Sequence, residues 1–406
     1  INMCNTPIQA ESSNGVSADS RHLLLQDTVR SAQGAEKDAQ WSQANELQQT
    51  LADGAVDARA TLEMCGIRWV SVVRCGGHSC ARTHRPVYGR HKPVEEARNA
   101  GAELVAALHD ACLRFSVSIR CGCTVRALVQ DARGDIVGVR CADSGAVIHA
   151  RRGVVLATGG FAANASMLQS ALGVGWAADI GTSNGSSAQG EGIALGCSVG
   201  AAVRDMNLVQ LHPTAFVAAA QRHGTTRHHM LAPEALRGYG GLLLRESDGS
   251  CCCDALATRQ VIAATLLNET QRRCVLCIPF DAAQQFGMQQ MQFYVDKQAV
   301  QKHADWQMLC NAMGWSHEAT ADLWPLSARS KPFYAGLVTP VTHYCMGGLC
   351  IDKDTRVLRA DGSPIKRLFA CGEVTGGVHG HNRLAGNSLL ECVVFGLRAG
   401  RSVLSQ

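Results

Sequence analysis

The spacing of apolar residues changes several times along the chain, and each spacing predicts a helix or a strand. A period near 3.6 residues predicts three helices in the first third of the chain, over Ser20–Ala32, Asp38–Cys65 and Val94–Phe115. An apolar segment predicts another helix over Leu389–Val403 near the end. In the third helix one stripe is apolar and is expected in the core: Leu104, Leu108, Ala111 and Phe115.

Short apolar runs separated by turn-forming residues follow the third helix. They lie at Val117–Ile119, Val125–Val129, Ile136–Val139 and Val147–His149, with turns at Asp131–Gly134 and Asp143–Gly145. This alternation predicts a β-meander. The next run, Gly153–Gly160, is continuous and ends in Thr-Gly-Gly, which is typical of a buried parallel strand whose end meets a cofactor.

The second half of the chain changes period again. Cys274–Phe280 is wholly apolar and predicts a buried strand, which we prefer to a redox or zinc role for its Cys-x-x-Cys. Residues 281–325 predict amphipathic helices with four core positions: Trp306, Leu309, Met313 and Trp315. A hairpin is expected over Ile351–Leu368, with its turn at Asp361-Gly362.

Composition narrows the class of protein. The 406 residues suffice for two domains or one large one, and 46% hydrophobic with 18% charged residues is an ordinary globular balance. A net charge of +4 is too small to indicate nucleic-acid binding, and no apolar run reaches the length of a membrane span.

The 19 cysteines are scattered through apolar runs, so we expect buried thiols in a reducing compartment, the cytoplasm or an organelle lumen. No metal site is predicted. Residues 221–230 hold three histidines and two arginines in no familiar ligand spacing, so a solvated loop is expected there.

The chemistry centres on Cys371–Leu389, CGEVTGGVHGHNRLAGNSL, which joins a strand-like run to the last helix. A helix start presents unpaired N–H groups and a positive dipole end, which suits an anion or a ring that becomes anionic. Arg383 precedes that start and suits a carboxylate. The alternative is a glycine-rich turn with an exposed arginine.

This stretch resembles the C-terminal flavin loop of the fumarate reductase/succinate dehydrogenase flavoprotein family, the soluble single-chain fumarate reductase branch in particular. Further motifs repeat the resemblance in the same order over nearly the whole chain. They are Gln210-Leu-His-Pro-Thr214, Pro233-Glu-Ala-Leu-Arg-Gly238, Ala257-Thr-Arg-Gln260 and Thr342-His-Tyr-Cys-Met-Gly-Gly348.

The resemblance implies FAD as cofactor. Glu373 matches a glutamate that binds ribityl or ribose hydroxyls, and the backbone around Asn387, Ser388 and Leu389 matches the segment at the flavin pyrimidine edge. Tyr344 matches a position against the flavin. Thr158, Gly159 and Gly160 would border the dinucleotide, and Glu191 stands where the family has an aspartate that contacts FAD.

The resemblance also implies a dicarboxylate substrate. His212, His343 and Arg383 match the groups that bind it, Arg259 matches the proton donor, and Glu234 and Arg237 match the proton relay. Three positions depart from the pattern: Pro233 replaces a threonine, Ala255 a glutamate and Gln260 an aspartate. We therefore expect Arg259 to lack the carboxylates that orient it in the family.

A chain of this family is expected to open with a strand, G-x-G-x-x-G and a helix. None is found, and Ile1–Glu11 resembles the segment after the family's first βαβ unit, so that unit is expected to be absent. The loop Cys75–Pro86 offers four further candidates for holding phosphate or positioning flavin, the alternative being a solvated basic turn: Ser79, Arg82, His84 and Arg85.

Together these features predict an α/β protein with an FAD-binding domain of the fumarate reductase type, incomplete at its N-terminus. It would comprise residues 1–204 and 344–406, interrupted by an α+β capping domain at 205–343. The expected activity is reduction of fumarate to succinate by an FAD-dependent oxidoreductase with an unknown electron donor. The alternatives are a relative acting on another dicarboxylate or an enone, and a degenerate flavoprotein fragment without activity.

Overall fold

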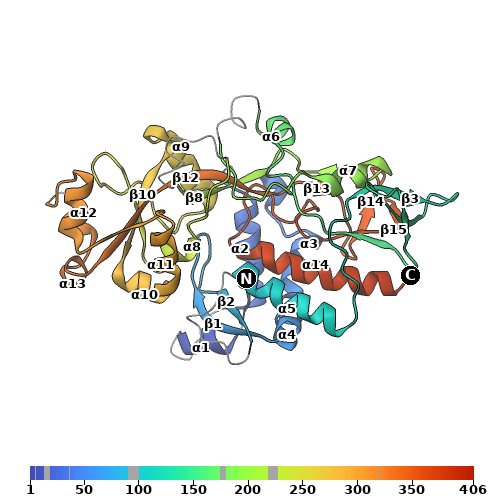
Figure 1. Ribbon diagram of the computed structural model, residues 1–406, viewed down its shortest axis with the longest axis horizontal. Helices are drawn as coiled ribbons and strands as arrows, with labels where there is room; N and C mark the ends of the chain where they lie inside the picture. The colour runs from blue at the N-terminus through green and yellow to red at the C-terminus, as the bar shows by residue number, and fades with distance from the viewer. Residues whose placement is uncertain are drawn as a thin grey trace.

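The structure is a computed structural model, and it describes residues 1–4, 6–12, 19–35, 37–89, 100–173, 180–217, 227–318 and 320–406. Two groups of elements lie side by side along its long axis (Figure 1). Elements from the middle of the sequence occupy one end, and elements from the N- and C-terminal parts occupy the other. The mixture of helices and sheets confirms the α/β class.

The first group is built from both ends of the chain. Its helices are α1 (Pro7–Ser12), α2 (Arg21–Ala32), η1 (Ala39–Trp41), α3 (Glu46–Asp53), α4 (Ala55–Met64), α5 (Ala100–Arg114), α6 (Ala165–Leu172), α7 (Glu191–Ser198) and α14 (Asn387–Leu404). Its strands are β1 (Ile67–Val73), β2 (Thr83–Tyr88), β3 (Val125–Gln130), β4 (Ile136–Cys141), β5 (Val147–His149), β6 (Val154–Leu156), β7 (Val203–Arg204), β13 (Gly348–Leu349), β14 (Arg356–Leu358) and β15 (Pro364–Ala370).

The second group surrounds one sheet, in which β9, β10, β12 and β11 are neighbours and β8 also pairs with β12. Its strands are β8 (Val209–Phe216), β9 (Leu242–Leu244), β10 (Cys274–Pro279), β11 (Gln301–His303) and β12 (Phe333–Cys345). Its helices are α8 (Glu234–Gly238), α9 (Arg259–Asn268), η4 (Thr270–Arg272), α10 (Phe280–Phe286), α11 (Met288–Asp296), α12 (Trp306–Met313), η5 (Ala321–Leu323) and α13 (Leu326–Arg329).

Each group has its own hydrophobic core. One core draws on residues between Ile1 and Val199 and again between Cys345 and Phe395. Two adjoining cores lie wholly between Phe216 and Val338. The antiparallel pair of β8 and β12 passes from one group to the other, so side chains near the inner ends of these strands lie between the cores.

The helix expected over Asp38–Cys65 is broken into η1, α3 and α4, so that prediction is wrong in its continuity. The break has a local cause. The Asn45 side chain accepts the Gln48 N–H and the Gln48 side chain accepts the Asn45 N–H, a capping box that starts a new helix. Gly54 separates α3 from α4, and a side chain there would collide with Val394.

The third helix begins at Ala100 in the described part of the chain, because residues 94–99 lie outside it. Its predicted stripe is partly wrong: Leu104 and Ala111 are buried, but Leu108 is 39% exposed and Phe115 is 79% exposed. The reason is that α5 packs on β2 and β1 through Leu104, Ala107 and Ala111, which turns Leu108 outward.

The strand expected at Val117–Ile119 does not form, although the rest of the meander, β3–β4–β5, is confirmed. Val117 and Ile119 are both about half exposed. A strand needs a neighbour for its backbone hydrogen bonds, and no described segment pairs with this one. The alternation of apolar residues therefore predicted a strand for which the described residues provide no partner strand.

Most of the remaining elements agree with expectation. The strand before Thr-Gly-Gly is β6, which pairs in parallel with β15, although Val155 is 39% exposed and the strand is only partly buried. The hairpin β14–β15, the buried strand β10 and the helix α14 are confirmed. Within 281–325 the strand β11 interrupts the helices, and Met313 is only half-buried.

The described helices include none that is long and apolar enough to span a bilayer. Residues 221–226 of the histidine-rich stretch lie outside the described part, so its expected loop is not tested there.

The loop Cys75–Pro86 uses its charges inside the fold. Arg82 is completely buried and donates to Asp19 and Asp27 at 2.6–3.3 Å, and the Ser79 side chain also bonds Asp27. His84 bonds Thr6 and the Arg82 carbonyl. Every described donor of the Arg82 guanidinium is therefore directed at protein groups, and the expectation that it holds a phosphate is wrong.

We expect Arg82→Leu to lower the free energy of unfolding by about 3–5 kcal/mol, because it removes the buried cation that Asp19 and Asp27 share and leaves Asp27 only its ion pair with the more exposed Arg30. Urea denaturation checks this. Arg21→Leu is the matched control, because Arg21 and Asp53 form an exposed pair whose loss costs less than about 1 kcal/mol. Equal losses in the two variants would contradict the assignment of Arg82 as a buried anchor.

Candidate active site

Two histidines face each other where β8 meets β12. His212 lies opposite Val341 in the strand pairing, and the rings of His212 and His343 meet edge to face with centroids 5.0 Å apart. Burial and the nearby Arg259 hold both pKa values well below 6.5, so both rings are neutral at physiological pH. The Thr214 N–H donates to His212 Nδ1 at 3.2 Å, which assigns the ring proton to Nε2.

Arg259 begins helix α9, which Thr258 caps, so its side chain starts from a fixed helix end. Its Nε donates to Glu234 Oε2 at 2.7 Å, and its Nη1 donates to Gln210 Oε1 at 3.4 Å. The arginine is therefore oriented by a carboxylate and an amide. The two carboxylates of the family pattern are absent at Ala255 and Gln260, as expected, and Glu234 orients Arg259 in their place.

Glu234 is shared between two segments and two arginines. Its Oε1 accepts the Gly76 N–H at 2.8 Å, and Arg237 Nη2 lies 3.9 Å from Oε2. Burial works to raise the pKa of Glu234, but Arg259 and Arg237 outweigh it and bring the pKa to about 2. Glu234 is consequently an anion throughout the physiological range.

Arg237 is buried and only partly paired. Its Nη1 donates to the Ala255 carbonyl at 2.5 Å, while its Nε and Nη2 have no hydrogen-bond partner. Burial lowers its pKa. Ala255 thus offers Arg237 a backbone oxygen where the family pattern has a carboxylate.

Arg383 is the buried cation with the fewest partners in the described site. Its guanidinium carbon lies 4.4 Å from the centroid of the Tyr344 ring, its Nη1 reaches only the Leu384 carbonyl at 3.5 Å, and its Nε is unpaired. Burial, together with Arg259, lowers its pKa to about 10. The alternative, a glycine-rich turn with an exposed arginine, is wrong, since Arg383 is 2% exposed.

The residues expected near the cofactor converge from four segments. A side chain at Gly160 would collide with the Glu373 carboxylate, and one at Gly192, beside Glu191, would collide with Thr158. The Cys345 N–H, next to Tyr344, donates to Glu373 at 2.9 Å. The end of β6, the start of α7, the end of β12 and the loop after β15 therefore meet.

The start of α14 has no side-chain cap. Gly386 occupies the N-cap position and has no side chain to accept a hydrogen bond, so the first-turn N–H groups at Ser388 and Leu389 belong to a helix end without a side-chain cap. The Asn387 side chain is occupied, because it accepts from Asn2 and donates to Thr28. Asn387 therefore holds the helix start in place through its side chain.

These residues fit the flavin half of FAD. Gly159 has a φ of +76° with open space where a side chain would lie, and the neighbouring Thr158 is exposed. Burial raises the pKa of Glu373 to about 7, which suits a carboxyl that shares hydrogen bonds with hydroxyls. No cluster of histidine, cysteine and carboxylate side chains in the described ranges is arranged to hold a metal ion.

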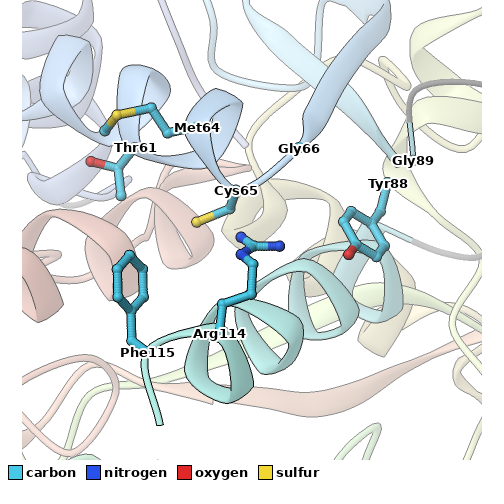
Figure 2. Close-up of a pocket in the computed structure, with 8 residues that line it drawn as sticks. All are labelled: Thr61, Met64, Cys65, Gly66, Tyr88, Gly89, Arg114 and Phe115. Carbon is cyan, nitrogen blue, oxygen red and sulfur yellow. The ribbon is translucent and has the colours of Figure 1, made fainter. Parts of the chain in front are cut away.

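A separate hollow of about 520 Å³ lies between the end of α4, β2 and the end of α5 (Figure 2). The residues around it include Met64, Cys65, Tyr88, Arg114 and Phe115. None of the residues predicted for catalysis or cofactor binding lines it. The hollow is therefore separate from the residues predicted for catalysis and cofactor binding.

Sequence reasoning missed several residues that hold the site. Gln210 joins Arg259 to the Arg383 carbonyl and to Asn382, and Ser183 bonds His343 Nδ1 at 2.7 Å. Glu391 accepts from Tyr344 and His379 beneath the flavin loop. Gln210 lies in a motif already singled out, but Ser183 and Glu391 carry no signal beyond polarity within a loop or an apolar helix.

Comparison with known proteins places this geometry among flavoproteins. A family model described as FAD binding domain matches residues 2–389. The chain is 32% identical to a fumarate reductase of Schizosaccharomyces pombe, with 98% of this chain and 80% of that protein covered. It is 30% identical to fumarate reductase 1 of Saccharomyces cerevisiae, with 95% and 85% covered.

A solved structure has the same fold. The open conformation of a flavocytochrome c3 fumarate reductase matches with a TM-score of 0.71 and 26% identity, and the match covers all of this chain and 70% of that one.

We expect the ionisation of Glu373 to make the free energy of unfolding depend on pH. A carboxyl whose pKa rises from 4.5 to about 7 on folding binds its proton more tightly in the folded state. Between these two pH values the free energy of unfolding therefore falls as the pH rises, by on the order of 3 kcal/mol in all.

Glu373→Gln removes this ionisation. The melting temperature of the variant relative to the unmodified protein should therefore be higher at about pH 8 than at about pH 5. Thermal unfolding of the two proteins at both pH values measures it. Glu46→Gln, at an exposed ion pair with Lys353, is the control and should show no such difference. A pH-independent offset for Glu373→Gln would rule out the raised pKa.

Proposed function

The chain is an FAD-dependent oxidoreductase of the fumarate reductase/succinate dehydrogenase flavoprotein family, and on this premise we propose that it reduces fumarate to succinate. One observation carries the proposal. Buried between the two cores are a cation without a carboxylate partner, Arg383, and two neutral histidines, His212 and His343. A substrate with two carboxylates supplies the negative charge that this group of side chains lacks.

Residues 205–343 act in this proposal as a capping domain. His212, Glu234, Arg237 and Arg259 come from its strands and helices, and His343 lies at its return point. Arg383 comes from the flavin-side loop. Substrate would lie between the two parts, where binding sites commonly form and where closure excludes water.

Binding and polarisation fall to the histidines and Arg383. A neutral His212 with its proton on Nε2 donates one hydrogen bond to a carboxylate, and His343 is held in position by Ser183. Arg383 offers a planar fork to the other carboxylate. Glu373 and the start of α14 would hold FAD, which when bound would supply the hydride.

Arg259 supplies the proton in this scheme. Its guanidinium is always charged in water, so it acts as an acid only when buried against substrate and resupplied with protons. Glu234 bonds Arg259 Nε directly and lies between it and Arg237, which makes it the connection along which a proton reaches Arg259.

We expect the flavin-loaded protein, once reduced with dithionite, to be reoxidised by fumarate. In Arg259→Ala the flavin should still bind, but reoxidation by fumarate should slow by at least about 10²–10⁴-fold, because the acid is missing. Visible absorption of the flavin follows both steps. Arg245→Ala, at a partly exposed pair with Glu269, is the control and should reoxidise at the normal rate.

A reduced flavin that fumarate does not reoxidise in the unmodified protein would eliminate fumarate as substrate and favour another acceptor, such as an enone. Absence of flavin after incubation with FAD would favour the degenerate-flavoprotein alternative.

We also expect that ligand binding at Arg383, measured without catalysis, distinguishes dicarboxylates from monocarboxylates. Succinate should raise the melting temperature of the flavin-loaded protein, by the equivalent of about 2.7 kcal/mol at one hundred times its Kd. Acetate, with one carboxylate, should raise it far less.

In Arg383→Met the rise with succinate should disappear, while the melting temperature without ligand should increase, because an unpaired buried charge is removed. An unchanged response to succinate in this variant would exclude Arg383 as a carboxylate ligand.

A further inference from the structure

Two cysteines lie at the base of the β3–β4 hairpin, away from the proposed active site. Cys141 is the last residue of β4, and Cys123 precedes β3 by two residues. Their sulfur atoms are 2.8 Å apart. The Ala142 N–H donates to the Thr124 carbonyl at 2.7 Å, so the backbone next to each cysteine is fixed to the other segment.

The distance between the sulfurs is short for two thiols and close to a covalent bond. A disulfide joins its sulfurs at about 2.05 Å, so bond formation needs a movement of less than about 1 Å. The backbone hydrogen bond means that this movement is made by side chains. The hairpin geometry is therefore already suited to a crosslink between Cys123 and Cys141.

Exposure distinguishes the two thiols. Cys141 is 6% exposed, whereas Cys123 is partly exposed and can meet a small molecule from solvent. A second pair, Cys252 and Cys274, also bonds thiol to thiol, but Cys274 is completely buried. Of these two thiol pairs, the one at the hairpin base is the one open to reagents.

We propose that Cys123 and Cys141 form a reversible disulfide in exchange with a small-molecule disulfide such as oxidised glutathione. The Cys123 thiolate attacks the glutathione disulfide and releases one glutathione. The Cys141 sulfur then attacks Cys123 Sγ and displaces the second glutathione. Two protein thiols are oxidised to one disulfide, one glutathione disulfide is reduced to two thiols, and the two protons pass to the released glutathione.

The crosslink would act on the support of the cofactor site. Strand β4 contacts β6 and β15, and β3 contacts α7. Thr158 follows the end of β6, Glu373 follows the end of β15, and Glu191 begins α7. Tying the base of the hairpin would restrict the meander on which they rest, and it would shorten the free chain in the unfolded state.

The experiment equilibrates the full chain with defined ratios of reduced to oxidised glutathione. Remaining thiols are then alkylated and the chain is digested for mass spectrometry. We expect a peptide pair joined through Cys123 and Cys141 that disappears on reduction. The melting temperature should rise by a few degrees in step with it.

The crosslink and the rise should both be lost in Cys123→Ser and in Cys141→Ser. Both should persist in Cys121→Ser, which removes the exposed thiol two residues away and is the matched control. Alkylation of Cys123 and Cys141 as free thiols at every ratio would overturn the proposal. So would a crosslink that joins Cys121 to Cys141 in place of Cys123.

Discussion

The buried carboxylate of Glu234 pairs with two arginines of the proposed site, Arg259 and Arg237. Taking charges out of water is costly, and an ion pair repays that cost only with close and well-directed partners. Glu234 meets this condition through Arg259 Nε and the Gly76 N–H, and its low pKa is the result. Arg383 has no comparable partner. Under the proposed function, a doubly anionic substrate supplies the carboxylate partner that Arg383 lacks.

Burial, together with the nearby Arg259, determines the protonation state of the histidines. A histidine beside an arginine and away from water loses its proton, so His212 and His343 remain neutral and can only donate or accept hydrogen bonds. Their position follows from the pairing of β8 with β12, which is fixed over most of the length of β8. The two neutral histidines therefore lie on paired strands. The cations lie on other elements, Arg259 at the start of α9 and Arg383 in the loop before α14.

Local patterns in the sequence predicted the elements whose formation depends on near neighbours. The meander, β10, the β14–β15 hairpin and α14 follow from periodicity and turn residues. Features that depend on distant segments were not predictable in this way. Gly76 bonds Glu234 across 158 residues, and Arg82 meets aspartates 55 and 63 residues away. A pattern of polar residues does not say which charges are buried together, so Arg82 suggested a phosphate site. The strand predicted at Val117–Ile119 does not form for the converse reason. Its local pattern is that of a strand, but the described residues contain no partner strand for it.

The structure shows which contacts are made by Ala255 and Gln260, the two residues that replace carboxylates of the family pattern. The Ala255 carbonyl accepts from Arg237, and Gln260 turns its side chain away to accept the Ala35 N–H. Neither residue orients Arg259, so its direction rests on Glu234 and Gln210. Arg237 is left with two unpaired nitrogens and a lowered pKa. A guanidinium that is buried and poorly paired gives up a proton more readily than one held by two carboxylates. Under the proposed function, an alanine at position 255 therefore leaves Arg237 without a carboxylate there, and the lowered pKa of Arg237 brings its acidity closer to what a proton relay requires.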